Sequence, residues 1–214
     1  MAAHLDDATN QITGSEVLTY TNNSPQKLGF LWMQLDQNLF KLDSRGTQIV
    51  PLVGNPPKQQ SRNWGRGQDF DAGDKIKSVQ LLNAKGPATD LKFLISDTRM
   101  QVFLPQDVAP NGGQVKLKIE YSFIEPNYGS DRTGIQETKN GKIFTIAQWY
   151  PRMCVYDDVM GWNTQPYTGP GEFYLEYGDF DLRITAPANH IVVASGQLLN
   201  PQEVYTPEQF KRWA

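Results

Sequence analysis

The stretch 114–123, QVKLKIEYSF, decides the fold class. Its apolar residues Val115, Leu117, Ile119 and Tyr121 recur at every second position, and mostly polar residues fill the positions between them. This period of two predicts a β-strand with one face buried and the other face in water. No internal run of ten or more residues has a competing helical period. The sequence therefore predicts a mostly β chain built from antiparallel strands.

Working outward from this strand, other alternating runs are separated by turn residues. Asn140-Gly141 predicts a two-residue hairpin, because a type I′ turn needs positive φ at both central positions. The predicted strands are 16–21, 27–40, 76–83, 91–95, 100–104, 142–149, 172–187 and 190–199. Together they favour one antiparallel β-sandwich domain.

Two regions depart from this rhythm. Residues 51–73 are rich in Pro, Gly and Asn and are interpreted as a long surface loop. Near the C-terminus, Thr206, Pro207 and Gln209 have the spacing of a capping box with Pro at the first helical position, so a short helical turn is expected. Since Ala214 follows within two turns, we interpret 1–214 as a piece of a longer polypeptide.

Bulk properties restrict the function classes. A length of 214 residues allows one sizeable core, and the net charge of -3 gives no electrostatic footprint for nucleic acid. No apolar run approaches the roughly 18 residues of a membrane-spanning helix. A signal peptide is also missing, which leaves an exported parent open, because a leader would have been removed.

Residues for metal or nucleophilic chemistry are sparse. Only His4 and His190 are present, neither has a neighbour at ligand spacing, and no HExxH occurs, so a zinc site within this chain is not expected. Cys154 has no nearby histidine that would favour its thiolate, and it is interpreted as a packing residue. Phosphate-binding glycine motifs and the G-x-S-x-G elbow are missing as well.

The segment AQWYPRMCVYDDVMGWNTQPY, residues 147–167, concentrates the remaining chemistry. Asp157 and Asp158 are adjacent, so in an extended segment they point to opposite faces and cannot share a proton. The aromatic residues of this segment favour either a buried joint or a surface that stacks on sugars. A free-standing β-sandwich that binds carbohydrate or protein therefore stays an open alternative.

Several motifs together resemble the amino-terminal domain of aminopeptidase-N-family zinc metallopeptidases (gluzincins), most closely their bacterial branch. They are Q-W-Y-P and V-Y-D-D within 148–158, G-E-F-Y-L-E-Y-G-D-F-D at 171–181, and I-T-A-P followed by V-V-A-S-G within 184–196. The opening stretch 12–35, ITGSEVLTYTNNSPQKLGFLWMQL, is similar to the start of that domain.

This resemblance implies a saddle-like antiparallel β-sandwich that packs on a separate catalytic domain, which is its expected partner. That catalytic domain would supply HExxH and the zinc, so no cofactor is expected in this chain and none of its residues is expected to be catalytic. The resemblance also implies an interdomain interface at Trp149, Tyr150, Arg152, Tyr156 and Trp162. Such an interface would suit these residue types, because Trp, Tyr and Arg are enriched in interface cores.

One substrate contact follows from the same resemblance. Relatives use a Gln or Glu at a strand end to accept a hydrogen bond from the α-amine of the peptide substrate. Gln148, which ends the predicted strand KIFTIAQ, is the candidate. Its spacing departs from the family pattern, because the family leaves about ten residues before the Phe-Pro pair, whereas Tyr150-Pro151 begins two residues after Gln148. A role in fixing the sheet edge is the alternative for Gln148.

Overall fold

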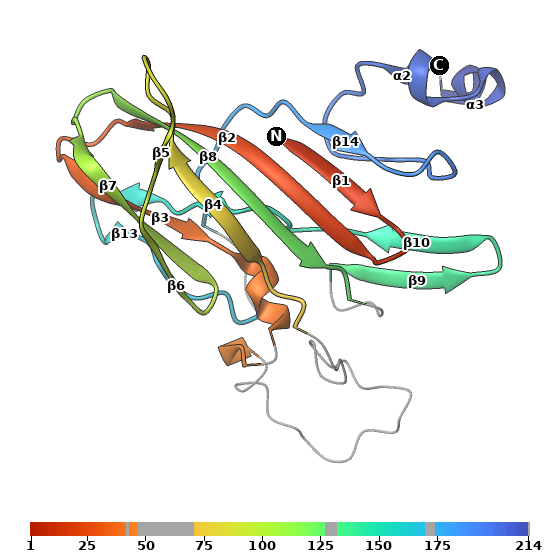
Figure 1. Cartoon of the computed structure of the whole chain (residues 1–214), viewed down its shortest axis with the longest axis horizontal. Helices are drawn as coiled ribbons and strands as arrows, with labels where there is room; N and C mark the ends of the chain where they lie inside the picture. The colour runs from red at the N-terminus through yellow and green to blue at the C-terminus, as the bar shows by residue number, and fades with distance from the viewer. Residues whose placement is uncertain (42, 47–70, 127–131, 170–173, 214) are drawn as a thin grey trace.

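The computed structural model describes residues 1–41, 43–46, 71–126, 132–169 and 174–213. Two β-sheets dominate it and share one apolar core (Figure 1). Nearly all strand pairs are antiparallel, and helix is confined to short segments. The predicted mostly β, antiparallel sandwich is confirmed.

The larger sheet is built around the strand that decides the fold class. Strand β8, Gly113–Ile124, pairs along its whole length with β2 and on its other side with β4, so its inner face is buried. The outermost pair, β1 with β14, is parallel. The order is β14 (Arg183–Thr185), β1 (Ala2–Asp6), β2 (Gln11–Asn22), β8, β4 (Lys75–Leu81), β5 (Thr89–Asp90).

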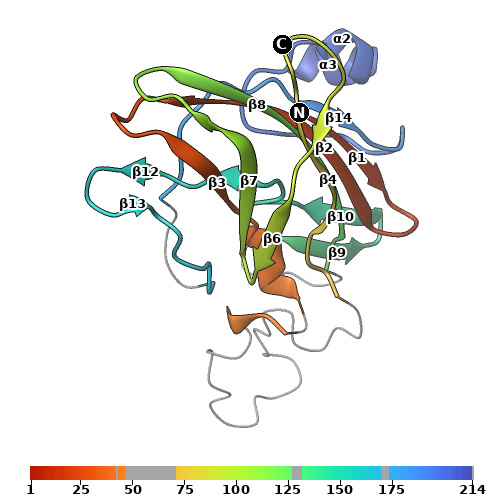
Figure 2. The ribbon, with the colours of Figure 1, turned by 60° about the vertical axis from the view of Figure 1, so that its left-hand side comes forward.

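The smaller sheet covers the inner face of the larger one. Its order is β11 (Arg152–Met153), β3 (Leu28–Gln34), β7 (Arg99–Val108), β6 (Phe93–Ser96). Figure 2 shows the two layers after rotation, with β7 and β6 in the foreground. Side chains of both sheets form one core, to which the smaller sheet contributes Leu31, Met33, Met100 and Val102 and the larger Ile12, Leu117, Ile119, Tyr121 and Phe123.

Two hairpins and two short helices complete the described chain. The hairpins are β9 (Gly134–Thr138) with β10 (Gly141–Thr145) and β12 (Tyr156–Asp157) with β13 (Gly161–Trp162). Helices α2 (Pro201–Val204) and α3 (Pro207–Trp213) end the chain. The predicted capping box precedes α3: Gln209 N–H donates to Thr206 Oγ1 at 3.2 Å, and Thr206 N–H donates to Gln209 Oε1 at 2.9 Å.

Two local predictions need correction, and a third falls largely outside the described residues. The strand predicted for 27–40 ends at Gln34, and Asp36–Phe40 forms a 3-10 helix, η1, whose residues are all buried. At the β9–β10 hairpin, Gly141 has φ of 114° but Asn140 is not in the positive-φ region, so the turn is not type I′. Most of the predicted loop 51–73 lies outside the described residues; only 71–73 can be placed.

The predicted strands 172–187 and 190–199 are the largest error. Within the described part of this region, only β14 and a single bridge between Leu175 and Cys154 have strand pairing. A strand needs a neighbour to satisfy its backbone N–H and C=O groups. The described residues provide no such neighbour for 191–199, which stays outside any sheet although its sequence is apolar.

Candidate functional site

Gln148, the predicted substrate contact, has an unusual backbone conformation. Strand β10 ends at Thr145, so Gln148 lies three residues beyond the strand and not at its end. Its φ is 57°, in the left-handed region that residues other than Gly seldom adopt. Such conformations cost free energy and occur often at functional sites. The residue is half-buried at the start of the aromatic segment.

The aromatic side chains after Gln148 pack on the core of the chain itself. Trp149, Tyr150, Tyr156 and Trp162 are half-buried against the core cluster. Trp149 meets Tyr150 edge to face with ring centroids 5.2 Å apart, and Tyr156 meets Trp162 in the same way at 5.2 Å. The four aromatic residues of the predicted interface thus lie in two pairs, and each residue has part of its surface covered.

The large apolar side chains that residues 147–167 expose are not these aromatic rings but two residues of the β12–β13 hairpin. At the tip of the β12–β13 hairpin, Val159 is 83% exposed and Met160 65% exposed. The carboxylate of Asp157 holds this tip, because it accepts hydrogen bonds from the backbone N–H of Met160 at 2.8 Å and from Asn163 Nδ2 at 2.8 Å. These hydrogen bonds lower the pKa of Asp157. Asp157 thus has a structural role, and Asp158 is exposed.

Arg152 joins strand β11 to helix η1. Its Nε donates to Asp36 Oδ2 at 2.8 Å, and its Nη2 donates to the same oxygen. Asp36 is 1% exposed. Burial raises the pKa of Asp36, although Arg152 acts against that rise. Because breaking a buried pair leaves one charge without compensation, this ion pair fixes η1 to the smaller sheet.

Cys154 and the two histidines, for which no chemistry is predicted, lie in different environments. Cys154 is 1% exposed, and burial raises the pKa of its thiol to about 12, so the thiolate is scarce at neutral pH. His190 contacts Asp7, with Nε2 and Oδ2 3.1 Å apart, and lies edge-on to Phe144. His4 lies on β1 and is exposed. Among the described residues, no three His, Cys, Asp or Glu side chains are grouped to hold a metal.

Besides Asp36, three more carboxyl groups are buried although no sequence motif marks them. Burial raises the pKa of Glu16 and of Asp74 to about 8, and the pKa of Glu125 to about 7. Each has one oxygen without a hydrogen-bond partner among the described residues. The alternation of buried and exposed positions could have indicated two of them. Glu16 follows Ile12 and Gly14 at a spacing of two, and Glu125 occupies the next inward-facing position after the buried residues of β8.

Gly14 makes room for the phenol ring of Tyr121. Gly14 on β2 is paired with Tyr121 on β8, and a Cβ added to Gly14 would lie 2.2 Å from Cζ of Tyr121. The ring therefore lies directly over the Gly14 backbone. Burial raises the pKa of Tyr121, and its hydroxyl has no hydrogen-bond partner among the described residues.

The segment 174–199 is the most exposed apolar part of the described chain. Figure 1 shows its strand β14 beside β1 and the chain continuing from there to α2 and α3. Its exposed large apolar side chains are Tyr174, Tyr177, Phe180, Ile184, Ile191, Val192, Val193 and Leu199. Single exposed apolar residues are ordinary, whereas large contiguous apolar patches often mark interaction sites; here eight such side chains share one segment of the chain.

Comparisons with known proteins found similarity in structure alone. No family model and no curated protein matches the sequence. Among solved structures, a variant of the M1 zinc metallopeptidase of Deinococcus radiodurans matches 63% of this chain and 22% of its own length, at 13% identity and a TM-score of 0.35. A two-domain M1 zinc metallopeptidase variant bound to L-tryptophan matches 87% and 32%, at 14% identity and 0.40.

A third neighbour is the Deinococcus radiodurans enzyme variant bound to a Tyr-Ser-Ala substrate, at 13% identity and a TM-score of 0.38, covering 87% of this chain and 32% of that one. The chain thus spans a third or less of these structures. Its structural neighbours are M1 zinc metallopeptidases at low identity and with partial coverage. At these scores the comparison does not assign the chain to their family. No described helix is long and apolar enough to cross a bilayer.

Proposed function

We propose that this chain is the non-catalytic amino-terminal β domain of a longer, bacterial, zinc-dependent aminopeptidase-like metallopeptidase. One observation carries the proposal. The region with the most specific motifs, 171–196, contains seven of the eighteen large apolar side chains that the described structure leaves exposed. This region has the motifs that resemble the aminopeptidase-N family, yet many of its apolar side chains are not covered by the described residues. Contact with the catalytic domain of the same polypeptide would cover them.

In this role the domain positions peptide and does not perform the chemistry. The zinc, held by the catalytic domain, would polarise a water molecule and the first peptide carbonyl. Gln148 would accept a hydrogen bond from the α-ammonium of the peptide through its side-chain oxygen. Its left-handed backbone would fix the direction of that side chain at the start of the aromatic segment. Trp149, Tyr150, Arg152, Tyr156 and Trp162 would complete the interdomain contact.

The alternative of a free-standing binding module receives less support. A carbohydrate module presents aromatic ring faces to a sugar. Here Trp149, Tyr150 and Trp162 are half-buried, and each has an edge contact with a neighbouring ring. The reading frame of the parent gene separates the two functions directly, because only a metallopeptidase has HExxH after this domain.

The interdomain contact is tested by Ile191→Ser, with Leu94→Ser as matched control, because the two side chains are 61% and 63% exposed. In the isolated chain we expect both changes to alter the free energy of unfolding by about 0.5 kcal/mol or less. In the full-length protein, Ile191→Ser should weaken the domain contact by about 1–2 kcal/mol, whereas Leu94→Ser should not. Equal behaviour of both variants in the full-length protein refutes the contact.

Two further measurements address the chemistry. The chain alone is expected to bind no stoichiometric zinc and to hydrolyse no aminoacyl substrate; one tightly held zinc per chain, lost on replacing His190, contradicts this. In the full-length protein, Gln148→Ala should lower kcat/KM on an unblocked peptide by the equivalent of about 1–3 kcal/mol. An unchanged kcat/KM shows that the amine anchor is another residue.

A further inference from the structure

The methionines of this chain lie in two very different environments. Met33 and Met100 are 0% exposed and Met153 is 7% exposed, so the core encloses their side chains. Met1 is half-buried. Met160, at the tip of the β12–β13 hairpin, is 65% exposed. A thioether in water is open to a dissolved oxidant, whereas one inside a close-packed core is not.

The hairpin tip keeps its shape through groups other than the Met160 side chain. Asp157 Oδ1 accepts hydrogen bonds from the backbone N–H of Met160 at 2.8 Å and of Val159 at 3.1 Å. Asp157 Oδ2 accepts another from Asn163 Nδ2 at 2.8 Å. None of these bonds involves the Met160 sulfur. A chemical change at this sulfur therefore leaves the bonds of the turn in place.

The base of the same hairpin is fixed to the rest of the chain. The rings of Tyr156 and Trp162 meet edge to face with centroids 5.2 Å apart, and Trp162 also contacts Tyr20 of the core at 6.1 Å. Figure 2 shows the hairpin at the left edge of the molecule. An anchored base and a hydrogen-bonded turn thus present Met160 and Val159 to solvent, where Val159 is 83% exposed.

Two features decide which oxidant reaches Met160. The only cysteine, Cys154, is 1% exposed, and burial raises the pKa of its thiol to about 12, so it does not compete as a thiolate. Hydrogen bonds from the Met160 N–H and from Asn163 lower the pKa of Asp157, and Asp158 is exposed. Negative charge at the tip disfavours anionic oxidants, so a neutral peroxide is the favoured class.

We propose that Met160 is a reversible oxidation site for hydrogen peroxide, carried on a hairpin whose fold does not depend on the sulfur. The sulfur attacks one peroxide oxygen, an S–O bond forms as the O–O bond breaks, and the other oxygen leaves as water. The sulfur is oxidised by two electrons and the peroxide is reduced by two.

The product changes the surface of the hairpin tip. A sulfoxide is polar, so it removes half of the exposed apolar pair formed by Val159 and Met160. Because the sulfoxide stays at the surface, methionine sulfoxide reductases can return it to the thioether with two electrons from a dithiol. The site belongs to this chain itself and does not rest on the proposed function.

Peroxide treatment of the folded chain at about pH 7, followed by peptide mass spectrometry, tests the site. Met160 should form its sulfoxide at least about tenfold faster than Met153, the matched buried methionine of the neighbouring strand β11. In urea the two rates should become similar, because unfolding exposes both side chains. Equal rates in the folded chain overturn the proposal.

Reversibility and the change of surface have their own measurements. Oxidation of Met160 alone should shift the melting temperature by less than about 2 °C and reduce retention in hydrophobic-interaction chromatography. Reductase and dithiol should restore the retention. Met160→Leu, which has a similar size and no sulfur, should keep its retention after the same peroxide treatment. A larger loss of melting temperature, an unchanged wild-type retention, or a sulfoxide that the reductases cannot remove from the folded chain contradicts the proposal.

Discussion

Glu125→Gln isolates the electrostatic cost of one buried carboxyl. Glu125 directly follows β8, is 0% exposed, and accepts a hydrogen bond from Thr133 Oγ1. Its Oε2 has no partner among the described residues. Burial raises the pKa of Glu125 to about 7, and the hydrogen bonds from Thr133 and Gly134 only partly oppose this rise. Glutamine has nearly the same shape and cannot ionise.

The sign of the pH effect follows from proton binding. The unfolded chain releases the proton of Glu125 near its ordinary pKa of 4.5, whereas the folded chain keeps it up to about pH 7. Between these values the folded state binds one proton more, so the free energy of unfolding falls as pH rises. The fall is about 1.4 kcal/mol per pH unit, which gives about 3 kcal/mol in all, and it ends above the folded pKa.

Urea unfolding of both proteins from about pH 5 to about pH 9 measures this effect. Glu16 and Asp74 titrate in both, so the difference between the two curves reports Glu125 alone. At about pH 5 the variant should match the wild type or be slightly less stable, and at about pH 8 it should be more stable by about 2–3 kcal/mol. Parallel curves over this range would show that Glu125 ionises freely in the folded chain, and the reasoning would be wrong.

Three other expectations test the packing. Gly14→Ala should lower the free energy of unfolding by about 1–3 kcal/mol, because its Cβ meets the ring of Tyr121; a loss that persists when Tyr121 is replaced by Val contradicts this cause. Cys154 should resist thiol reagents at about pH 8 in the folded chain and react in urea, and equal rates in both would contradict its burial. Thr206→Ala should destabilise residues 207–213 by about 1 kcal/mol in hydrogen exchange without changing the melting temperature of the sheets; an unchanged helix contradicts the capping role.

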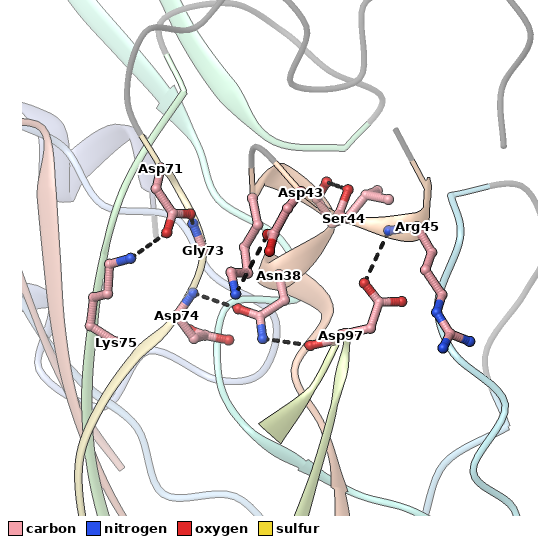
Figure 3. Close-up of polar contacts among 11 residues, drawn as sticks. Asn38, Asp43, Ser44, Arg45, Asp71, Gly73, Asp74, Lys75 and Asp97 are labelled. Carbon is pink, nitrogen blue, oxygen red and sulfur yellow. Dashed lines mark hydrogen bonds and ion pairs between the residues drawn. The ribbon is translucent and has the colours of Figure 1, made fainter. Parts of the chain in front are cut away.

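Alternation of apolar residues predicted the fold where the pattern and the pairing agree. Residues 114–123 alternate almost without error and pair on both sides, so the local pattern and the tertiary structure favour the same strand. In 27–40 they diverge. Gln37 and Asn38 bond to Ala72, Asp74 and Asp97, which lie far along the chain, and these bonds favour η1 over a continued strand (Figure 3 shows the bonds of Asn38). A local pattern contains no information about such partners.

The sequence indicated which residues could be important, but it did not indicate the residues that surround them in the fold. The capping box at Thr206 and Gln209 formed as predicted because its bonds are local. By contrast, the partner of Arg152 is Asp36, 116 positions away, and no spacing rule connects them. The carboxyl of Glu16 appeared as an ordinary polar residue of a strand, and only its inward phase on β2 indicates burial.

Burial also separates two kinds of contribution to the proposed interdomain contact. Trp149, Tyr150, Tyr156 and Trp162 each pack partly on the core, so truncating them should destabilise the chain itself as well as any contact with a catalytic domain. The side chains of 191–199 touch little of the described structure, so truncating them should weaken the contact alone. Comparing the two sets in the isolated chain and in the full-length protein therefore measures how much of the contact each segment provides. After the loss of stability in the isolated chain is subtracted, a contact centred on the aromatic segment predicts the larger loss for the aromatic truncations. A contact centred on 191–199 predicts the larger loss for truncations in that segment.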